Sequence, residues 1–535
     1  MGIIETDILI IGGGGAGMRA ALSAQERGAE VLLISKTPIA KSTCTYLSGG
    51  AFSLAVEGMS EEAHLKATLQ AGRGINASNL MKILVGEALQ RVHELERLGV
   101  VGEWRKGRFY CLGTPPAWGA PLARAMADAV KKKGISLLPW VIVSDLLIEE
   151  GRAVGALGFD FHRGKFLGLA AKAVILANGG GGALYQRHDN PVRITGDGYA
   201  LAFHAGCPLR DMEFVQFIPS GLAEPGKHPI LIAPSLCDAG RVVNSLGEDI
   251  LKKYRITEKP VAVRSRDSFS QAIFMEEMEG REVFLDLRRV SEEEWPRDNM
   301  AHSQRDLLMR NFACLLKPIR ISPMCHHFMG GVVADPKGMT EIPGLFAAGE
   351  VVGGVHGANR MGGNALVEVL VFGHRAGESA AGWAKERVRG KSAETLIHDR
   401  LRVLHGMATS SGKGLPPKAV RKMIGEILWK ESGILRDRQG LEKALDSLRR
   451  IRQEMLPQMN AETPKETLEK MEVENALLVG EMITRCAIMR EESRGAHFRK
   501  DFPKTDDKKW RGNIFLKKSG DGMSLEFRPL PEKIP

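Results

Sequence analysis

Long hydrophobic runs are missing from this 535-residue sequence. No apolar stretch approaches the roughly 20 residues of a transmembrane helix, so the sequence predicts no direct membrane span. Residues 1–11 carry no basic segment followed by an apolar one and no twin arginine. We therefore expect no signal peptide and a cytoplasmic protein.

Cysteine is sparse and follows no pattern. The sequence has seven cysteines and no C-x-x-C pair. An unpaired, scattered set is typical of a reducing compartment, and it argues against a zinc or iron–sulfur site held by this chain. We predict no metal site. The seven residues are Cys44, Cys111, Cys207, Cys237, Cys314, Cys325 and Cys486.

A strong excess of charge of one sign is also missing. The chain has 74 Lys+Arg and 64 Asp+Glu, a net charge of +10, and the two signs are interleaved along its length. We read this as a solvated surface and expect no nucleic-acid partner. Hydrophobic residues make up 44% and charged residues 26%, which is typical of a globular protein of about two to four domains.

Glycine is abundant instead, with 61 residues. The first cluster, Gly12-x-Gly14-x-x-Gly17, follows a strand-like run at 7–11 and precedes a helix-forming stretch at 18–27. This arrangement predicts a dinucleotide whose phosphates lie at the helix N-terminus. The second strand, at 31–34, ends in Ser35-Lys36 rather than in the acidic residue that binds the ribose of NAD, which disfavours NAD.

Two later runs, 173–177 and 345–348, have the same strand-to-glycine pattern, so we expect one α/β sheet assembled from separated segments. Residues from about 222 to 325 mix turns, charged helical pieces and a strand, which indicates an inserted domain. From about 385 the apolar spacing becomes helical.

Many further motifs follow in order. They are Lys41-Ser42-Thr43, Ser48-Gly49-Gly50, Ala177-Asn178-Gly179-Gly180, Thr195-Gly196-Asp197-Gly198, Arg266-Asp267, His326-x-x-Met329-Gly330-Gly331, Gly344-Leu345-Phe346-Ala347-Ala348-Gly349-Glu350, His356-Gly357-Ala358-Asn359-Arg360 and Glu492-Ser493-Arg494-Gly495-Ala496-His497. Over essentially the whole chain, this series resembles the flavoprotein subunits of succinate dehydrogenase and fumarate reductase. L-aspartate oxidases and adenylylsulfate reductase flavoproteins are relatives of that family.

The resemblance implies a Rossmann-like FAD-binding domain in two parts, 1–221 and 326–384, with an inserted α+β capping domain at 222–325. A helical domain at 385–498 and a C-terminal extension at 499–535 follow. The resemblance also implies which residues contact FAD. These are Gly12, Gly14, Gly15, Ala16, Gly17, Ser35, Lys36, Ser42, Thr43, Gly49, Gly50, Asn178, Gly179, Asp197, Glu350, Asn364, Ala365 and Leu366.

For the substrate side, the resemblance implies three catalytic residues. Arg266 matches the arginine that transfers a proton, Arg360 the arginine that binds a carboxylate, and His326 a retained histidine. Planar guanidinium groups suit this task because they bind carboxylates through two hydrogen bonds.

Three departures from the family pattern change the expected chemistry. Thr43 replaces the histidine that links FAD covalently, so we expect non-covalent FAD. Ile218 replaces a carboxylate-binding histidine. A Thr-Glu pair and an arginine of the next loop are missing, at about Ile232-Ala233 and Leu236. Because an apolar side chain replaces no hydrogen bond to a carboxylate, fumarate is expected to bind poorly.

The sequence therefore predicts an FAD-dependent oxidoreductase that acts on CH–CH or CH–NH groups, with hydride transfer between flavin N5 and an unsaturated or saturated carboxylate or acyl substrate. The resemblance implies that electrons pass to an iron–sulfur subunit, and because this chain has no cluster ligands of its own, that subunit is expected to be a separate partner chain. Two alternatives stay open. One is a soluble L-aspartate-oxidase-like flavoenzyme, and the other is a non-catalytic electron-transfer or scaffold subunit of a larger redox complex.

Overall fold

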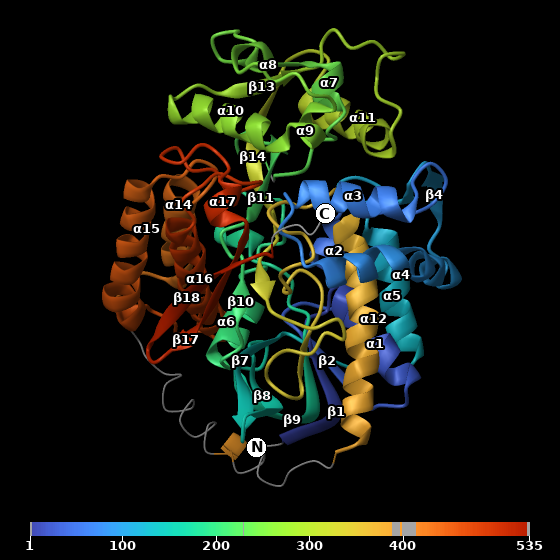
Figure 1. Ribbon diagram of the computed structural model, residues 1–535, viewed down its shortest axis with the longest axis vertical. Coiled ribbons are helices and arrows are strands. Elements are labelled where there is room, and N and C mark those ends of the chain that lie inside the picture. The colour runs from blue at the N-terminus through green and yellow to red at the C-terminus, as the bar shows by residue number, and fades with distance from the viewer. Residues whose placement is uncertain (1–2, 228, 388–395, 399–412, 532–535) are drawn as a thin grey trace.

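The computed structural model describes residues 3–227, 229–387, 396–398 and 413–531. Figure 1 shows a large sheet flanked by helices, a separate cap at one end of the long axis, and a C-terminal group of helices beside the sheet. This arrangement confirms the predicted α/β fold class.

The main sheet is built from segments far apart in the sequence. β1 pairs in parallel with β2 and β9, and β16 pairs in parallel with the end of β9, as the strand-to-glycine runs predicted. β7 and β8 extend the sheet antiparallel. In spatial order the strands are β6 (Ser136–Pro139), β2 (Val31–Ser35), β1 (Ile3–Ile11), β9 (Lys165–Leu176), β8 (Arg152–Asp160) and β7 (Val141–Glu149), with β16 (Leu345–Ala347) beside β9.

A layer of long helices lies beside this sheet in Figure 1. α12 packs along α1 and against α4, and their buried aliphatic residues form one core with the strands. This core fixes the N-terminus of α1 at the end of β1, where the first glycine motif lies. The helices are α1 (Gly15–Glu26), α4 (Ser78–Arg97), α5 (Ala120–Lys132) and α12 (Asn364–Lys385).

Short elements connect the sheet to the cap. They are α2 (Cys44–Leu47), β3 (Ala51–Ser53), α3 (Glu61–Ala71), β4 (Gly102–Arg105), β5 (Arg108–Cys111), a 3-10 turn (Gly182–Leu184), α6 (Asp197–His204), β10 (Leu209–Arg210) and β15 (Gly331–Val332). β3, β5 and β4 form a small antiparallel sheet of their own.

The cap is an antiparallel sheet with five helices around it. Its apolar core draws on residues between Leu222 and Ile321, within the predicted capping segment, while the domain boundaries themselves stay predictions. The strands lie in the order β11 (Val215–Leu222), β14 (Ile319–Phe328), β13 (Val283–Asp286) and β12 (Arg241–Asn244), and the helices are α7 (Leu236–Ala239), α8 (Ile250–Lys253), α9 (Val261–Arg264), α10 (Arg266–Met278) and α11 (Asn299–Phe312).

The C-terminal part contains the predicted helices and a hairpin that the sequence reading missed. The basic, turn-rich tail forms two strands, because β17 pairs with β10, a strand some 300 positions earlier in the chain. The elements are α14 (Pro417–Glu431), α15 (Arg438–Arg450), a π-helical segment (Ile451–Met455), a 3-10 turn (Leu456–Gln458), α16 (Pro464–Met489), α17 (Asp507–Trp510), β17 (Gly512–Ser519) and β18 (Gly522–Pro529).

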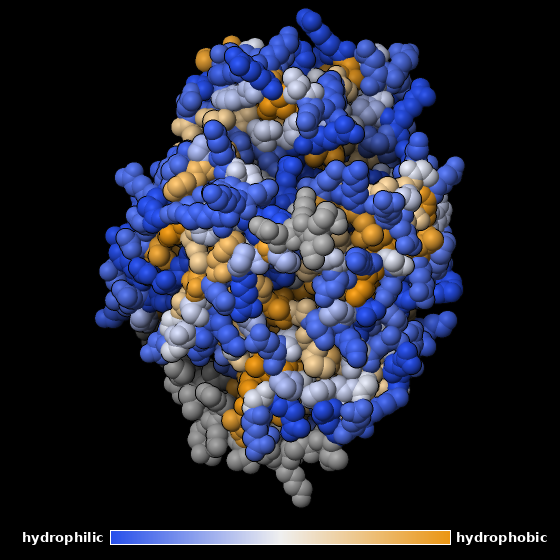
Figure 2. Space-filling view, in the orientation of Figure 1, coloured by the Kyte–Doolittle hydropathy of each residue, from blue (hydrophilic) through white to orange (hydrophobic). Residues whose placement is uncertain are grey.

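The face of the molecule in Figure 2 is largely hydrophilic, and its hydrophobic residues lie in small separate patches. Among the helices of the described residues, none combines the length and apolar character needed to cross a membrane.

Candidate active site

The first glycine motif allows strand, turn and helix to pack closely. Gly12 has a φ of 127°, and a Cβ on it would lie 2.1 Å from the Ala177 carbonyl oxygen. A Cβ on Gly17 would lie 1.9 Å from the carbonyl oxygen of Gly12. Neither position can hold another residue, and the turn leaves the N-terminus of α1 open, because Gly14 has no side chain to cap it.

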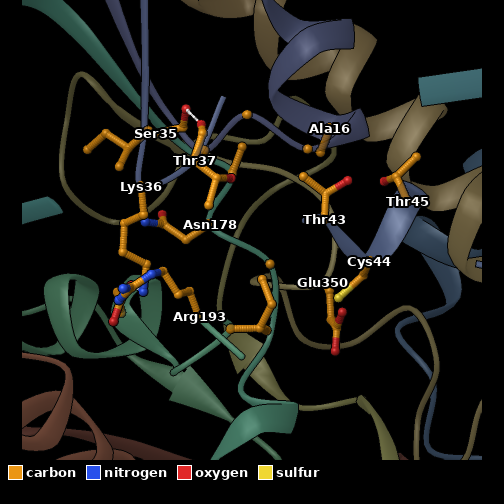
Figure 3. A pocket seen from close by; sticks show the side chains of 18 of the residues that line it. Ala16, Ser35, Lys36, Thr37, Thr43, Cys44, Thr45, Asn178, Arg193 and Glu350 are labelled. Atoms are coloured by element: carbon orange, nitrogen blue, oxygen red, sulfur yellow. Dashed lines mark hydrogen bonds and ion pairs between the residues drawn. The ribbon is translucent and has the colours of Figure 1, made fainter. Parts of the chain in front are cut away.

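A cavity of about 120 Å³ lies at this N-terminus. We call it the nucleotide end. Figure 3 shows Lys36 and Arg193 close together on one side of it and Cys44 and Glu350 on the other. Twelve of the residues predicted to bind FAD line it. They are Gly12, Gly14, Gly15, Ala16, Ser35, Lys36, Ser42, Thr43, Asn178, Gly179, Asp197 and Glu350.

The charges of the nucleotide end are balanced within the protein. Lys36 Nζ lies 2.6 Å from Asp197 Oδ2 and 2.9 Å from Glu472 Oε1 of α16. Arg193 and Arg421 each lie 3.3 Å from the same Glu472 carboxylate, which is fully buried. Burial alone would raise the pKa of Asp197, but Lys36 and hydrogen bonds from neighbouring side chains bring that pKa below its usual value.

The groups that are left unsatisfied fit a dinucleotide that carries a sugar alcohol chain. The buried Asn178 Oδ1 has no hydrogen-bond partner among the described residues, and the amides of α1 face the cavity. Burial raises the pKa of Glu350 to about 7, although the Phe328 amide donates to its Oε1 at 3.0 Å and the charge of Arg360 acts in the opposite direction. A carboxyl group of this kind suits hydroxyl groups as hydrogen-bond partners.

Thr43, which stands where the family pattern has the flavin-linking histidine, has a structural role. Its side-chain oxygen accepts a hydrogen bond of 3.2 Å from the Tyr46 amide and caps α2. Two residues on, Thr45 Oγ1 accepts a bond of 3.1 Å from the Gly15 amide, which ties α2 to the start of α1.

A second cavity, of about 260 Å³, continues from Cys44 and Glu350 toward the cap. We call it the substrate end. It brings together Arg266, His326 and Arg360, the three predicted catalytic residues, although they come from α10, β14 and the loop before α12. The predicted cofactor residues Gly49, Gly50, Ala365 and Leu366 also line it.

Two predicted cofactor residues line neither cavity. Gly17 packs against Gly12, as described above. Asn364 is fully buried, where its Oδ1 lies 2.9 Å from His64 Nε2 and its Nδ2 donates to Thr68 Oγ1 at 2.9 Å. Gly17 therefore serves the close packing of α1 against the strand, and the Asn364 side chain serves the packing at the N-terminus of α12.

Arg360 is buried and Arg266 is half-buried, and the two arginines are in contact with each other. Arg266 Nη1 donates to the Arg360 carbonyl oxygen at 3.2 Å, and Arg360 Nη2 donates to Gln216 Oε1 at 2.9 Å. Burial, and then the charge of Arg266, lowers the pKa of Arg360 to about 10, and burial also lowers the pKa of Arg266. Their Nε atoms have no hydrogen-bond partner among the described residues.

His326 has a carboxylate partner that sequence reasoning missed. Its Nδ1 lies 2.7 Å from Asp189 Oδ2, which orients the ring at the cavity. Asp189 is 137 positions away in the chain, and no motif marked it. The adjacent His327 was missed as well. It lines the same cavity, and burial, together with the charge of Arg360, holds the pKa of its ring well below the usual value.

Part of the lining of the substrate end is apolar and comes from the cap. Ile218 does line the cavity, as its position in the motif predicted, but Ile232 and Ala233 lie in the core of the cap instead. Their neighbours Leu231 and Pro234 take the wall positions. The other apolar wall residues from the cap are Pro219, Ala262, Val263 and Met300.

Three buried groups beneath the substrate end, His327, His356 and Glu368, are close enough together to hold a metal ion. His356 Nε2 lies 3.0 Å from Glu368 Oε2, whereas His356 Nδ1, Glu368 Oε1 and His327 Nε2 have no hydrogen-bond partner among the described residues. The sequence predicted no metal site.

Comparisons with known proteins agree with this geometry. A family described as FAD binding domain matches residues 7–366, and one described as fumarate reductase flavoprotein C-term matches residues 421–534. The fumarate reductase (CoM/CoB) of Methanothermobacter marburgensis has a subunit that is 33% identical, over 96% of this chain and 97% of its own length. L-aspartate oxidase of Streptomyces coelicolor is 30% identical, over 97% and 92%.

Among solved structures, the quinol fumarate reductase of E. coli matches with a TM-score of 0.88 and 27% identity, over 100% of this chain and 98% of that one. Adenylylsulfate reductase of Archaeoglobus fulgidus, at 20% identity and a TM-score of 0.80, over 100% of this chain and 97% of that one, shares the fold. The chain therefore belongs to the fumarate reductase and succinate dehydrogenase flavoprotein family of FAD-dependent oxidoreductases.

Proposed function

We propose that the protein holds FAD non-covalently and exchanges hydride with a carboxylic acid or acyl compound that is not simple fumarate or succinate. Electrons pass to or from an iron–sulfur partner subunit. The observation that carries the proposal is the mixed lining of the substrate end, where arginines and a histidine share one cavity with apolar residues around Ile218.

The charged wall supports binding of one carboxylate or carbonyl end. Arg360 presents a guanidinium fork beside the Asp189-oriented ring of His326. Donors of this kind also stabilise the negative charge that develops when a double bond next to a carboxyl group is reduced.

Arg266 is the group proposed to hold the transferred proton. An arginine normally stays protonated, because its pKa lies above 12. Burial lowers the pKa of Arg266, which reduces the cost of giving up a proton from its guanidinium to a substrate carbon. Bound FAD supplies the hydride acceptor or donor.

The apolar lining supports a substrate whose part next to Ile218 is weakly polar, as in a 2-enoate or an acyl thioester. A hydrogen bond to a charged group contributes about 1.5–3 kcal/mol, and Ile218 offers none to a second carboxylate at its position. Ser220 does not compensate, because its Oγ donates to the Ile232 carbonyl oxygen at 3.0 Å.

Non-covalent FAD is supported by Thr43, whose side chain caps α2 and has no imidazole nitrogen to form a link. Acid precipitation of the purified protein should release all flavin into the supernatant. Flavin that stays with the precipitate would contradict this part of the proposal.

An iron–sulfur partner is supported by the seven cysteines, six of which are buried. Burial raises the pKa of every one of the seven thiols, so none is poised as a thiolate ligand. Purification from the native source should yield a second chain with the electron paramagnetic resonance signal of an iron–sulfur cluster. Purification as a single active chain would contradict the partner.

Steady-state assays with a reduced low-potential dye test the substrate class. Trans-2-hexenoate should oxidise the dye at least about 10-fold faster than fumarate at equal concentration. Rapid turnover of fumarate would overturn the proposal. Oxygen-dependent oxidation of L-aspartate would favour the oxidase alternative.

A further inference from the structure

Arg108 is a cation of the substrate end that no sequence motif marked. It lies at the start of β5, where its backbone pairs with Ser53 of β3, and its half-buried side chain lines the cavity. Within the described part of the chain, the Arg108 guanidinium makes no hydrogen bond or ion pair with protein. An arginine in a cavity wall without a counter-ion is prepared for an anion from outside the chain.

A neighbouring arginine provides the contrast. Arg105 stands opposite Arg108 in the β4–β5 hairpin. Its Nη2 donates to Glu103 Oε2 at 2.8 Å, and its guanidinium lies 5.9 Å from the centre of the Tyr110 ring. The two arginines share one hairpin, but the exposed Arg105 is partnered, whereas Arg108, which lines the cavity, has no partner among the described residues.

Arg108 also stands close to other positive charge. Burial is the main cause of the lowered pKa of Arg266, and the charge of Arg108 lowers it further, against the opposing effect of Asp267. Like charges in one cavity disfavour each other unless an anion lies between them. A ligand that brings negative charge to both Arg266 and Arg108 removes the repulsion between them.

Short contacts connect the backbone of Arg108 with the neighbourhood of Arg266. Arg266 donates to the Arg360 carbonyl oxygen, and a Cβ on Gly362 would lie 4.0 Å from Arg266 Nη2. Ser53 Oγ donates to the Gly362 carbonyl oxygen at 2.7 Å, and Ser53 is the strand partner of Arg108. The charge of Arg108 acts on the pKa of Arg266, and the charge of Arg266 acts on the pKa of Arg360, so Arg266 is the neighbour that the other two cations share.

We propose that Arg108 binds a second carboxylate of the substrate, farther from the first than in a four-carbon acid. This inference rests on the proposed function, in which Arg360 and His326 bind the first carboxylate. The substrate class is then an unsaturated dicarboxylate longer than fumarate, with an apolar stretch against the wall of Ile218. Arg108 provides a contact for the second carboxylate that Ile218 cannot make, and it does so at another place in the cavity.

Calorimetric titration of the oxidised, FAD-loaded protein tests the inference without turnover. The probes are two pairs of saturated acids, butanoate with succinate and hexanoate with adipate. In the unaltered protein, adipate should bind at least about 10-fold more tightly than hexanoate, because the added carboxylate gains a charge-assisted hydrogen bond. Succinate should gain little over butanoate, since its second carboxylate does not reach Arg108.

Two variants assign the difference to Arg108. Arg108→Leu should lower adipate affinity to that of hexanoate and leave hexanoate within about 2-fold, and Arg108→Lys should restore part of the difference. Arg105→Leu is the matched control and should change neither acid. If Arg108→Leu fails to fold, the lysine variant and the chain-length series still decide the matter.

Each other outcome has a definite meaning. If the monocarboxylates bind but a second carboxylate adds no affinity, this inference is overturned and the proposed function stands. Equal weakening of both acids by Arg108→Leu would overturn it as well, and so would a change of flavin midpoint potential in that variant without ligand. If no acid of either series binds, the proposed function itself fails.

Discussion

The nucleotide end and the substrate end of this flavoprotein treat charge in opposite ways. At the nucleotide end, Lys36, Arg193 and Arg421 all reach the buried carboxylate of Glu472. At the substrate end, Arg108 has no partner and the buried Nε atoms of Arg266 and Arg360 are unsatisfied, within the described chain. Charges that are balanced inside the protein hold its parts together, whereas charges left unbalanced are available to a ligand.

The largest effect should follow from breaking the balance at the nucleotide end. Glu472→Ala leaves three cations without their shared carboxylate and should lower the free energy of unfolding by about 3–5 kcal/mol. It should also weaken retention of FAD, because Lys36 and Arg193 line that cavity. Denaturant unfolding and fluorescence of released flavin measure both effects. Glu469→Ala, one turn earlier on α16, is the control, and equal losses in both variants would contradict the account.

The opposite result is expected at the substrate end. Arg266→Ala should reduce turnover by about 100-fold or more, while the free energy of unfolding stays within about 1 kcal/mol, since a buried charge without a full set of partners is removed. FAD should remain bound. Arg264→Ala, exposed and two residues earlier, should keep full activity. Retained turnover in Arg266→Ala would favour a non-catalytic subunit.

Much of the nucleotide end could be predicted from the sequence, because its determinants are local. Gly12, Gly14 and Gly17 lie in one short turn between a strand and a helix. Their spacing alone indicates that strand, turn and helix pack too closely there for a side chain. Lys36 lines the cavity, and its contact with FAD stays a prediction, whereas no motif marked its partner Glu472, because the ion pair joins residues 436 positions apart.

Less of the substrate end could be predicted. The family motifs placed Arg266, His326 and Arg360, and the structure brings all three to one cavity. Asp189 and Arg108 follow no motif, and they reach the cavity only because β14 and the β4–β5 hairpin pack where they do. The β17–β18 hairpin was missed for the same reason, since its strand partner β10 lies early in the chain.

Two acids that line the nucleotide end should respond oppositely to pH. The folded-state pKa of Glu350, about 7, lies above its usual value of 4.5, so protonation favours the folded state and stability falls as pH rises between these values. Asp197 has a lowered pKa, and its contribution is lost only in acid.

Unfolding of the FAD-free protein at pH 5 and pH 8 measures the effect of Glu350. Between pH 5 and pH 8, the free energy of unfolding of the unaltered protein should fall by up to about 3 kcal/mol more than that of Glu350→Gln. The same pH dependence in both proteins would show that Glu350 does not titrate as described.

The smallest expected change bears most directly on the central claim, that the apolar wall at Ile218 excludes a compact dicarboxylate. Anaerobically reduced protein mixed with fumarate or with trans-2-hexenoate reports reoxidation of the flavin by its absorbance in a single turnover. The account predicts that hexenoate reacts at least about 10-fold faster than fumarate in the unaltered protein, and that Ile218→His raises the fumarate rate by about 10-fold. A fumarate rate equal to or above that of hexenoate, unchanged by Ile218→His, would contradict it.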